Sequence, residues 1–217
     1  FNAFVRASVG QMQTMHHGIE SYLETNWTSP IQFNIGNSYG WYTITNEPLY
    51  EIRLADNVYK VQSGRLLLKN FPATSHPQSV QAFTINYQPN YSLRISYTTL
   101  YASRRAISHD LFRRSDWVKD NLPTTDNWEA LYTPVWAPNQ WVSNLFISKN
   151  FQMVTQKSKI NLRLTSSIRN LLNASIPSLI FEQSRYDYKN FSLQKFPPKY
   201  IYDLGRTYTI GLQVSML

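Results

Sequence analysis

The chain has 217 residues, of which 42% are hydrophobic, 15% aromatic and only 16% charged, whereas typical soluble domains carry a charge on roughly a quarter of their residues. It has no Cys, which excludes a disulfide framework and thiolate metal sites. The net charge of +8 favours contact with anionic lipid headgroups or anionic ligands. Its Lys and Arg residues are scattered, with adjacent pairs only at 104–105 and 113–114, which does not favour nucleic-acid binding.

The chain begins at Phe1 without the charged and apolar regions of a signal peptide, and no apolar run is long enough for a transmembrane helix. Its many Tyr and Trp residues suit a boundary between oil and water, because each has an apolar ring and a polar tip. A mature outer-membrane protein, a fragment of one, and a soluble β-domain are all compatible with this composition.

Apolar and polar residues alternate with a period of two along much of the chain, which predicts strands rather than helices. In chain order, the predicted strands cover 19–27, 31–41, 83–87, 93–101, 141–149, 160–169 and 208–216. The last is the clearest, since Tyr208, Ile210, Leu212, Val214 and Met216 alternate with polar or small residues. That length and pattern are typical of one tilted strand of a membrane barrel.

The connections between these strands are of two kinds. Those at 28–30 and 88–92 are short and contain Pro or Asn, which mark tight turns. Those at roughly 46–77, 103–138 and 171–204 are long, with no clear secondary structure, which is unusual in a compact soluble domain. Short periplasmic turns and long extracellular loops are typical of outer-membrane barrels, so we expect an antiparallel transmembrane β-barrel segment.

Aromatic residues near the strand ends support the same interpretation. Trp27, Trp41, Tyr101 and Tyr208 are the predicted membrane-interface girdle, where aromatic rings sit at the headgroup level. The alternative is a soluble β-sandwich in which the aromatic rings fill the core.

The polar faces of the predicted strands carry several charges. These are Glu20, Glu24, Arg94, Arg163 and Arg169. In a small closed barrel such charges would have to pair tightly, whereas in a wide barrel they face water or a plug.

Several stretches resemble TonB-dependent outer-membrane receptors. Ser167–Asn173 (SIRNLLN) resembles the V-x-N-L-F/L-N stretch on their penultimate strand, and Gly205–Leu212 (GRTYTIGL) resembles their G-R-x-Y-x-x-G-L closing strand. His17–Glu20 is similar to their H-x-G-(I/V)-E strand start, and 71–81 to a loop-to-strand entry in receptors from Bacteroidota. The resemblance runs from about residue 14 to 217, with one departure: the chain ends in Ser215-Met216-Leu217 rather than in an aromatic residue.

The resemblance implies a barrel of about 22 strands that is blocked by an N-terminal plug and uses inner-membrane energy to import a siderophore, glycan or peptide. Residues 1–217 would then be the C-terminal portion of the barrel domain, roughly its last seven or eight strands, without the plug or a TonB box. The implied location is the outer membrane. The implied partners are the lipid bilayer and lipopolysaccharide, the rest of the receptor, the inner-membrane TonB complex and a surface lipoprotein.

Two other interpretations fit the residues. One is a free-standing eight-stranded outer-membrane barrel with a structural or adhesive role, in which Phe1–Val9 would be the first strand and pair with 205–217. The other is a soluble extracellular β-sandwich that binds carbohydrate or protein.

The long connections contain the aromatic and Arg residues that often anchor ligands and protein partners. The candidate ligand-binding residues are Arg113, Arg114, Trp117, Trp128, Tyr132, Trp136, Arg185, Tyr186 and Tyr188. The same residues could instead pack the loops against one another.

No pattern points to catalysis, a metal ion or a cofactor. The chain lacks a Gly-x-Ser-x-Gly elbow, a phosphate-binding loop and a dinucleotide fingerprint. His16 and His17 would point to opposite faces of a strand, and His76 and His109 lie in different long connections. The acidic residues of 110–129 do not have EF-hand spacing. We therefore expect no enzyme activity and no cofactor.

Overall fold

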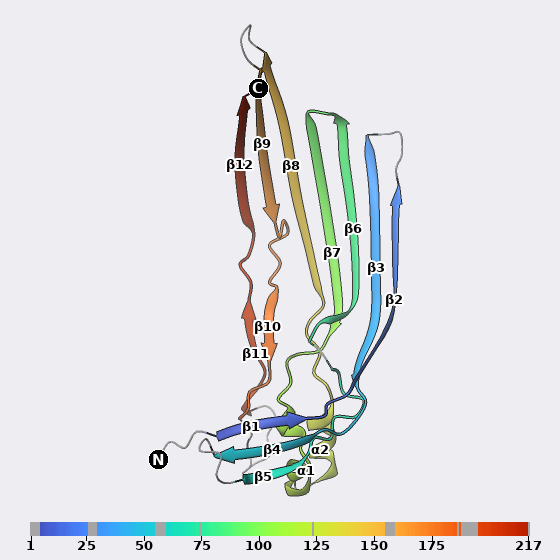
Figure 1. The fold of residues 1–217 in the computed structure, drawn as a ribbon, viewed down its shortest axis with the longest axis vertical. Helices are drawn as coiled ribbons and strands as arrows, with labels where there is room; N and C mark the ends of the chain where they lie inside the picture. Colours follow the sequence, from blue (N-terminus) through green and yellow to red (C-terminus); the bar gives the residue numbers. More distant parts are fainter. Residues whose placement is uncertain are drawn as a thin grey trace.

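The computed structural model describes residues 5–25, 30–54, 60–73, 75–122, 124–154, 159–185, 187 and 195–216. These residues are mostly β, with three antiparallel sheets and a few short helices (Figure 1). Within this part of the chain, no helix has the length and hydropathy needed to cross a membrane. The prediction of an all-β, antiparallel fold is confirmed at this level.

The largest sheet has seven strands. They are β2 (Thr14–Thr25), β3 (Ile31–Ile44), β6 (Pro77–Asn90), β7 (Leu93–Arg105), β8 (Gln140–Val154), β9 (Lys159–Arg169) and β12 (Thr207–Met216). Their order in the sheet is their order in the chain, and each is antiparallel to its neighbours. All seven predicted strands are present, and β6 is much longer than the predicted 83–87.

The connections alternate as the sequence predicted. Strands β2, β6 and β8 end, and β3, β7 and β9 begin, at one end of the sheet, together with the end of β12 (Figure 1). Only a few residues separate the two strands of each pair in the sequence. The long connections gather at the other end and form what we call the loop region. Whether the two ends face the periplasm and the cell exterior stays a prediction.

The expectation that the long connections lack clear secondary structure was wrong. They contain β4 (Leu49–Leu54), β5 (Lys60–Arg65), η1 (Leu111–Arg114), α1 (Asp116–Asn121), α2 (Thr125–Tyr132), β10 (Pro177–Phe181) and β11 (Lys199–Tyr202). These elements are short, so they show no long alternating pattern.

The N-terminal strand does not close the large sheet. Strand β1 (Val5–Gly10) pairs with β4, from Val5 opposite Leu54 to Gly10 opposite Leu49, and β4 pairs with β5 in a separate small sheet. Among the described residues β2 and β12 are the two edges of the large sheet, and no sheet closes. The pairing of Phe1–Val9 with 205–217, which the alternative of a free-standing barrel requires, is therefore not found for the described residues 5–9.

The strand register gives the large sheet two chemically different flanks. One row across it contains Tyr208, Ile168, Leu145, Tyr97, Ile85 and Phe33. The next row toward the loop region contains Glu24, Asn34, Thr84, Thr98 and Asn144. Because side chains alternate along a strand, these rows lie on opposite flanks, which we call the apolar flank and the polar flank.

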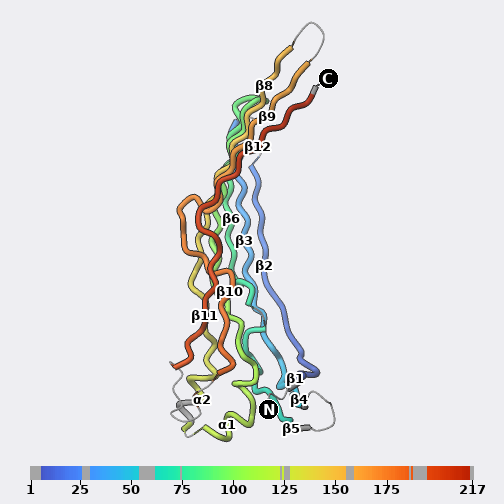
Figure 2. Tube along the Cα trace, turned by 90° about the vertical axis from the view of Figure 1, so that its left-hand side faces the viewer, coloured from blue at the N-terminus to red at the C-terminus, as the bar shows by residue number. Residues whose placement is uncertain are grey.

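Neither flank is covered in the described part of the chain. Figures 1 and 2 show the sheet of β1, β4 and β5 and the helices beyond one end of the large sheet, while β10 and β11 continue β9 and β12 toward that end. No element of the loop region packs extensively on the strands of the large sheet. The face-to-face stacking of a β-sandwich is thus not found among the described residues.

Candidate functional site

The loop region has its own hydrophobic core. Ile44, Tyr50, Leu66, Leu68 and Phe71 form a buried cluster in which no side chain is more than 3% exposed. Burial on this scale stabilises a fold by roughly 1.5–3 kcal/mol for each large apolar side chain. The loop region therefore packs around an interior, as a soluble domain does.

A buried ion pair contacts this core. The Arg114 guanidinium is fully buried and donates two hydrogen bonds to Glu182, with Nη1–Oε2 and Nη2–Oε1 distances of 2.6 and 2.9 Å. It also donates to the carbonyl of Asp110 and lies over the Phe71 ring, 4.6 Å from the ring centroid. Bidentate geometry of this kind offsets the cost of burying both charges.

The surroundings of the ion pair shift two pKa values. Burial acts to raise the pKa of Glu182, but the hydrogen bonds and charge of Arg114, the Asp110 N–H and the Arg113 charge together hold it below its ordinary value. Burial lowers the pKa of His109 to about 4, with a further lowering from Arg114 and an opposing effect of Glu182. The neutral His109 ring accepts a hydrogen bond through Nε2 from the Val135 N–H at 3.0 Å.

The structure places several candidate ligand-binding residues inside this packing. Arg113 and Arg114 are 7% and 0% exposed, and both guanidinium groups lie against Glu182. Trp128 stacks on Tyr132 with ring centroids 5.6 Å apart, and the Tyr132 hydroxyl donates to the carbonyl of Lys69. For these four residues, the geometry favours loop packing over contact with a ligand.

The remaining candidates lie elsewhere. Trp117 and Trp136 are 45% and 42% exposed, and the Arg104 guanidinium lies 5.8 Å from the centroid of the Trp136 ring. Arg185 is exposed. Tyr186 and Tyr188 lie outside the described residues. A loop-side ligand site stays a prediction.

Three of the predicted girdle residues, Trp41, Tyr101 and Tyr208, lie on the apolar flank. Trp41 stacks on His17 and Tyr101 packs against Trp141, both toward the loop region, while Tyr208 is the second residue of β12. Trp27 lies outside the described residues. The sequence prediction missed Trp141, which its register opposite Tyr101 places on the same flank. It also missed Tyr39, two residues before Trp41 on the same strand and packed against it.

The two C-terminal motifs that carry the resemblance contact each other. Asn170 and Asn173 both have φ of 54°, a left-handed conformation that Asn tolerates better than most residues, and they turn the chain away from β9. The Asn173 side-chain carbonyl accepts the backbone N–H of Arg206 at 2.9 Å. A Cβ on Gly205 would lie 2.7 Å from the same oxygen, so a larger residue there would force the Asn173 side chain to shift.

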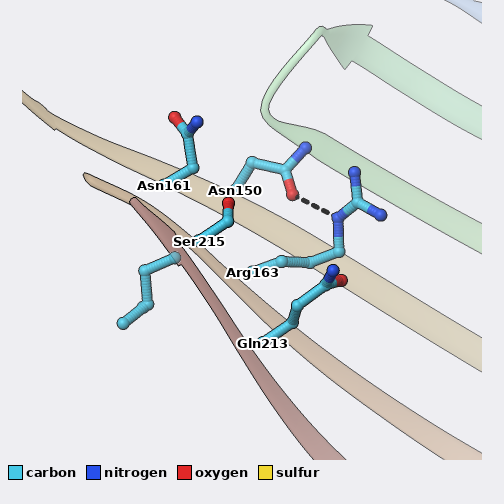
Figure 3. A pocket seen from close by; sticks show the side chains of 6 residues that line it. Asn150, Asn161, Arg163, Gln213 and Ser215 are labelled. Atoms are coloured by element: carbon cyan, nitrogen blue, oxygen red, sulfur yellow. Dashed lines mark hydrogen bonds between the residues drawn. The ribbon is translucent and has the colours of Figure 1, made fainter. Parts of the chain in front are cut away.

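The polar flank contains two neighbouring hollows toward the short-turn end of the sheet. One, of about 240 Å³, is lined by polar residues of β8, β9 and β12 and by Leu162 (Figure 3). The other, of about 360 Å³, reaches across β8 to β7. Arg163 and Asn150 line both hollows, and the Arg163 Nε donates to the Asn150 Oδ1 at 2.8 Å. The sequence prediction placed Arg94 and Arg163 on this flank but did not identify the hollows.

The histidines do not form a common site. His16 and His17 lie on opposite flanks of β2, against Tyr42 and Trp41 respectively. His109 packs on Phe71 in the loop core. Within the described ranges, no group of three or more His, Asp or Glu side chains could hold a metal ion.

Comparison of the chain with models of known protein families, with curated proteins and with solved structures finds no match.

Proposed function

We propose that the chain is the C-terminal barrel portion of a TonB-dependent outer-membrane receptor of the Bacteroidota type. The apolar flank contacts the bilayer and lipopolysaccharide, and the polar flank faces the lumen. The remaining strands and the plug come from the rest of the receptor. The assembled receptor takes up a siderophore, glycan or peptide with energy from the inner-membrane TonB complex, and a surface lipoprotein is a further partner.

The observation that carries the proposal is the exposed apolar flank of a sheet with two open edges. Ile210, Ile19 and Leu212 are 77%, 73% and 64% exposed, and no second sheet among the described residues covers them. Soluble proteins rarely leave so extensive an apolar surface uncovered. A bilayer is the surrounding in which such a flank is stable, and further strands on β2 and β12 would remove the edges.

Polar groups on the apolar flank are paired with each other. Ser143 is fully buried there, where it accepts a hydrogen bond from the Tyr97 hydroxyl at 3.0 Å and shares one with the Thr99 hydroxyl at 3.1 Å. Such pairing is what a surface without water requires, because an unsatisfied polar group in hydrocarbon costs several kcal/mol.

The one Lys on the apolar flank of β8 also supports the proposal that this flank contacts the bilayer. Lys149 pairs with Leu93 and Leu164 across the sheet, yet its Nζ donates to the Ser92 Oγ in the short β6–β7 turn at 3.0 Å. The aliphatic part of the side chain can thus stay on the apolar flank while the ammonium group reaches the polar end.

The location is tested by fractionating cells that express the full protein. We expect it in the outer-membrane fraction, resistant to extraction with carbonate and soluble only in detergent. A stable monomer in detergent-free buffer would reject both membrane interpretations, including the free-standing adhesive barrel.

The transport role is tested with cells in which the gene is deleted and restored. We expect growth on one scarce iron, glycan or peptide source to depend on the gene. A protonophore should abolish accumulation of that nutrient and leave its surface binding intact. Normal growth and uptake in the deletion strain on all three nutrient classes would reject the receptor.

A further inference from the structure

We propose that the two hollows of the polar flank form one binding site for a small solute that carries at least two carboxylate or phosphate groups. The inference rests on the proposed function, because it requires the part of the polar flank around these hollows to face water in the lumen rather than the plug. It goes further by assigning a ligand class to this site.

Positive charge is concentrated in these hollows. Arg94 from β7 and Arg163 from β9 both line the larger hollow, and neither hollow has an Asp or Glu in its lining. In the described part of the chain, neither guanidinium forms an ion pair. Two unneutralised guanidinium groups beside one hollow favour a ligand with two negative groups.

The arginine side chains keep donors free for a ligand. Arg163 uses its Nε for Asn150, which leaves its two terminal nitrogens without a partner among the described residues (Figure 3). Arg94 makes a single long contact, from Nη2 to the Asn86 Oδ1 at 3.4 Å, and that oxygen accepts a shorter bond from Ser96. Both guanidinium groups can therefore donate to an oxyanion.

The acidic residues of the same flank lie too far across the sheet to neutralise these arginines. Glu20 and Glu24 lie on β2, the opposite edge, and β3 and β6 separate them from β7. Arg169, on the same flank of β9 but nearer the loop region, lines a different hollow, whose lining also includes Asp203. The flank is thus acidic at one edge and basic around β7 to β9, which fits anion binding at one position.

Neutral polar groups would recognise the rest of the solute. Asn161, Gln213 and Ser215 line the smaller hollow, and Figure 3 shows their side chains on the same side of the sheet as Arg163. Amide and hydroxyl groups can both donate to and accept from ligand hydroxyls. The site therefore suits a hydroxylated or otherwise polar dianion better than an apolar acid.

The test measures citrate binding to the full protein purified in detergent, by calorimetry at low salt, with the uncharged trimethyl ester of citrate as the matched probe. We expect citrate to bind and the ester not to bind. Arg94→Gln and Arg163→Gln should each weaken citrate binding by about tenfold or more, since each removes a charge-assisted hydrogen bond to the anion. Arg163→Lys, which keeps the charge, should lose less.

Arg169→Gln is the control, because it removes the same charge from the same flank of β9 outside the two hollows. Equal weakening by Arg169→Gln, or undiminished binding to both hollow variants, would overturn the site. Binding of a hexaglutamate peptide with no binding of citrate would assign the hollows to an acidic polypeptide instead and would also overturn it. Outer-membrane fractionation of the same variants separates a failure of this site from a failure of the proposed function.

Discussion

Leu68 in the loop region is 0% exposed, whereas the equally apolar Ile210 in the large sheet is 77% exposed. The loop region buries aliphatic and aromatic side chains around a core and pairs its buried charge, as soluble proteins do. The large sheet has regular hydrogen bonding, but among the described residues its strands contribute only Ile44 to a buried hydrophobic cluster. One chain thus combines a region that buries its apolar side chains with a region whose apolar side chains stay exposed among the described residues.

The largest expected effect concerns the loop region. Arg114→Ala would leave the Glu182 carboxylate buried without its partner, which typically costs about 3–5 kcal/mol of the free energy of unfolding. Limited proteolysis in detergent, as a function of urea, would report the loss in the loop region. Arg53→Ala is the control, because its guanidinium is 46% exposed and its ion pair with Glu51 should contribute less than about 1 kcal/mol. Similar losses in the two variants would refute the buried ion pair.

The next effect separates the two flanks of the sheet. Leu212→Arg should cost about 2–4 kcal/mol in lipid vesicles if Leu212 lies near the middle of the bilayer, because the charge would enter hydrocarbon. Gln213→Arg, one residue away on the polar flank, should cost much less. Unfolding of the vesicle-inserted protein in urea measures both. Equal tolerance at the two positions would contradict the assignment of the flanks.

A smaller effect is expected where the sheet meets the loop region. Asn170→Ala should cost about 2 kcal/mol, because Ala is strained at a φ of 54° and the two side-chain hydrogen bonds to Ala174 are lost. Asn170→Gly relieves the backbone strain but does not restore the two hydrogen bonds, so it should cost about half as much. Thermal unfolding in detergent compares the two variants. A glycine variant no more stable than the alanine variant would argue against the strain.

The smallest effect is a pH dependence confined to the loop region. The pKa of His109 is lowered to about 4 in the folded state, so the unfolded state binds more protons between about pH 6.5 and 4. The contribution of neutral His109 to the free energy of unfolding is fully present above about pH 6.5. It is lost as the pH falls toward 4, and the loss is about 1–2 kcal/mol after allowance for partial exposure. Glu182 adds to the loss at lower pH, because its depressed pKa means that protonation breaks the ion pair.

Hydrogen exchange of the loop and strand amides at pH 7 and pH 5 measures this dependence. The loop amides should lose protection in the wild type and less so in His109→Gln, while amides of β7 to β9 should change little. A loss of the same size in the strands would show that the two regions unfold together.

The sequence predicted the large sheet well because alternation along a two-sided strand is a local pattern. Thr207–Met216 and Ile31–Ile44 extend the predicted 208–216 and 31–41 by only a few residues. The pattern failed in the long connections, where β4 and β5 are short and packing depends on partners far away in the chain. Arg114 and Glu182 are 68 residues apart, so no local pattern could pair them.

The candidate site was predictable only in part. The alternation placed Arg94 and Arg163 on one flank, but their convergence on one hollow depends on the register between β7, β8 and β9. The predicted girdle is limited in the same way. Trp41 and Tyr101 stand out in the sequence, whereas only the register opposite Tyr101 places Trp141 on the same flank.

The strictly sequential order of the large sheet has a consequence for how such proteins change over time. Every strand hydrogen-bonds to its predecessor and successor among the seven, and β3 ends at the same side of the molecule where β8 starts. If the β6–β7 hairpin were excised, β3 could pair with β8 in the same antiparallel sense, and a duplicated hairpin could insert between them. The directions of all other strands would not change. The width of the sheet can therefore evolve in steps of one hairpin without changing the path of the rest of the chain.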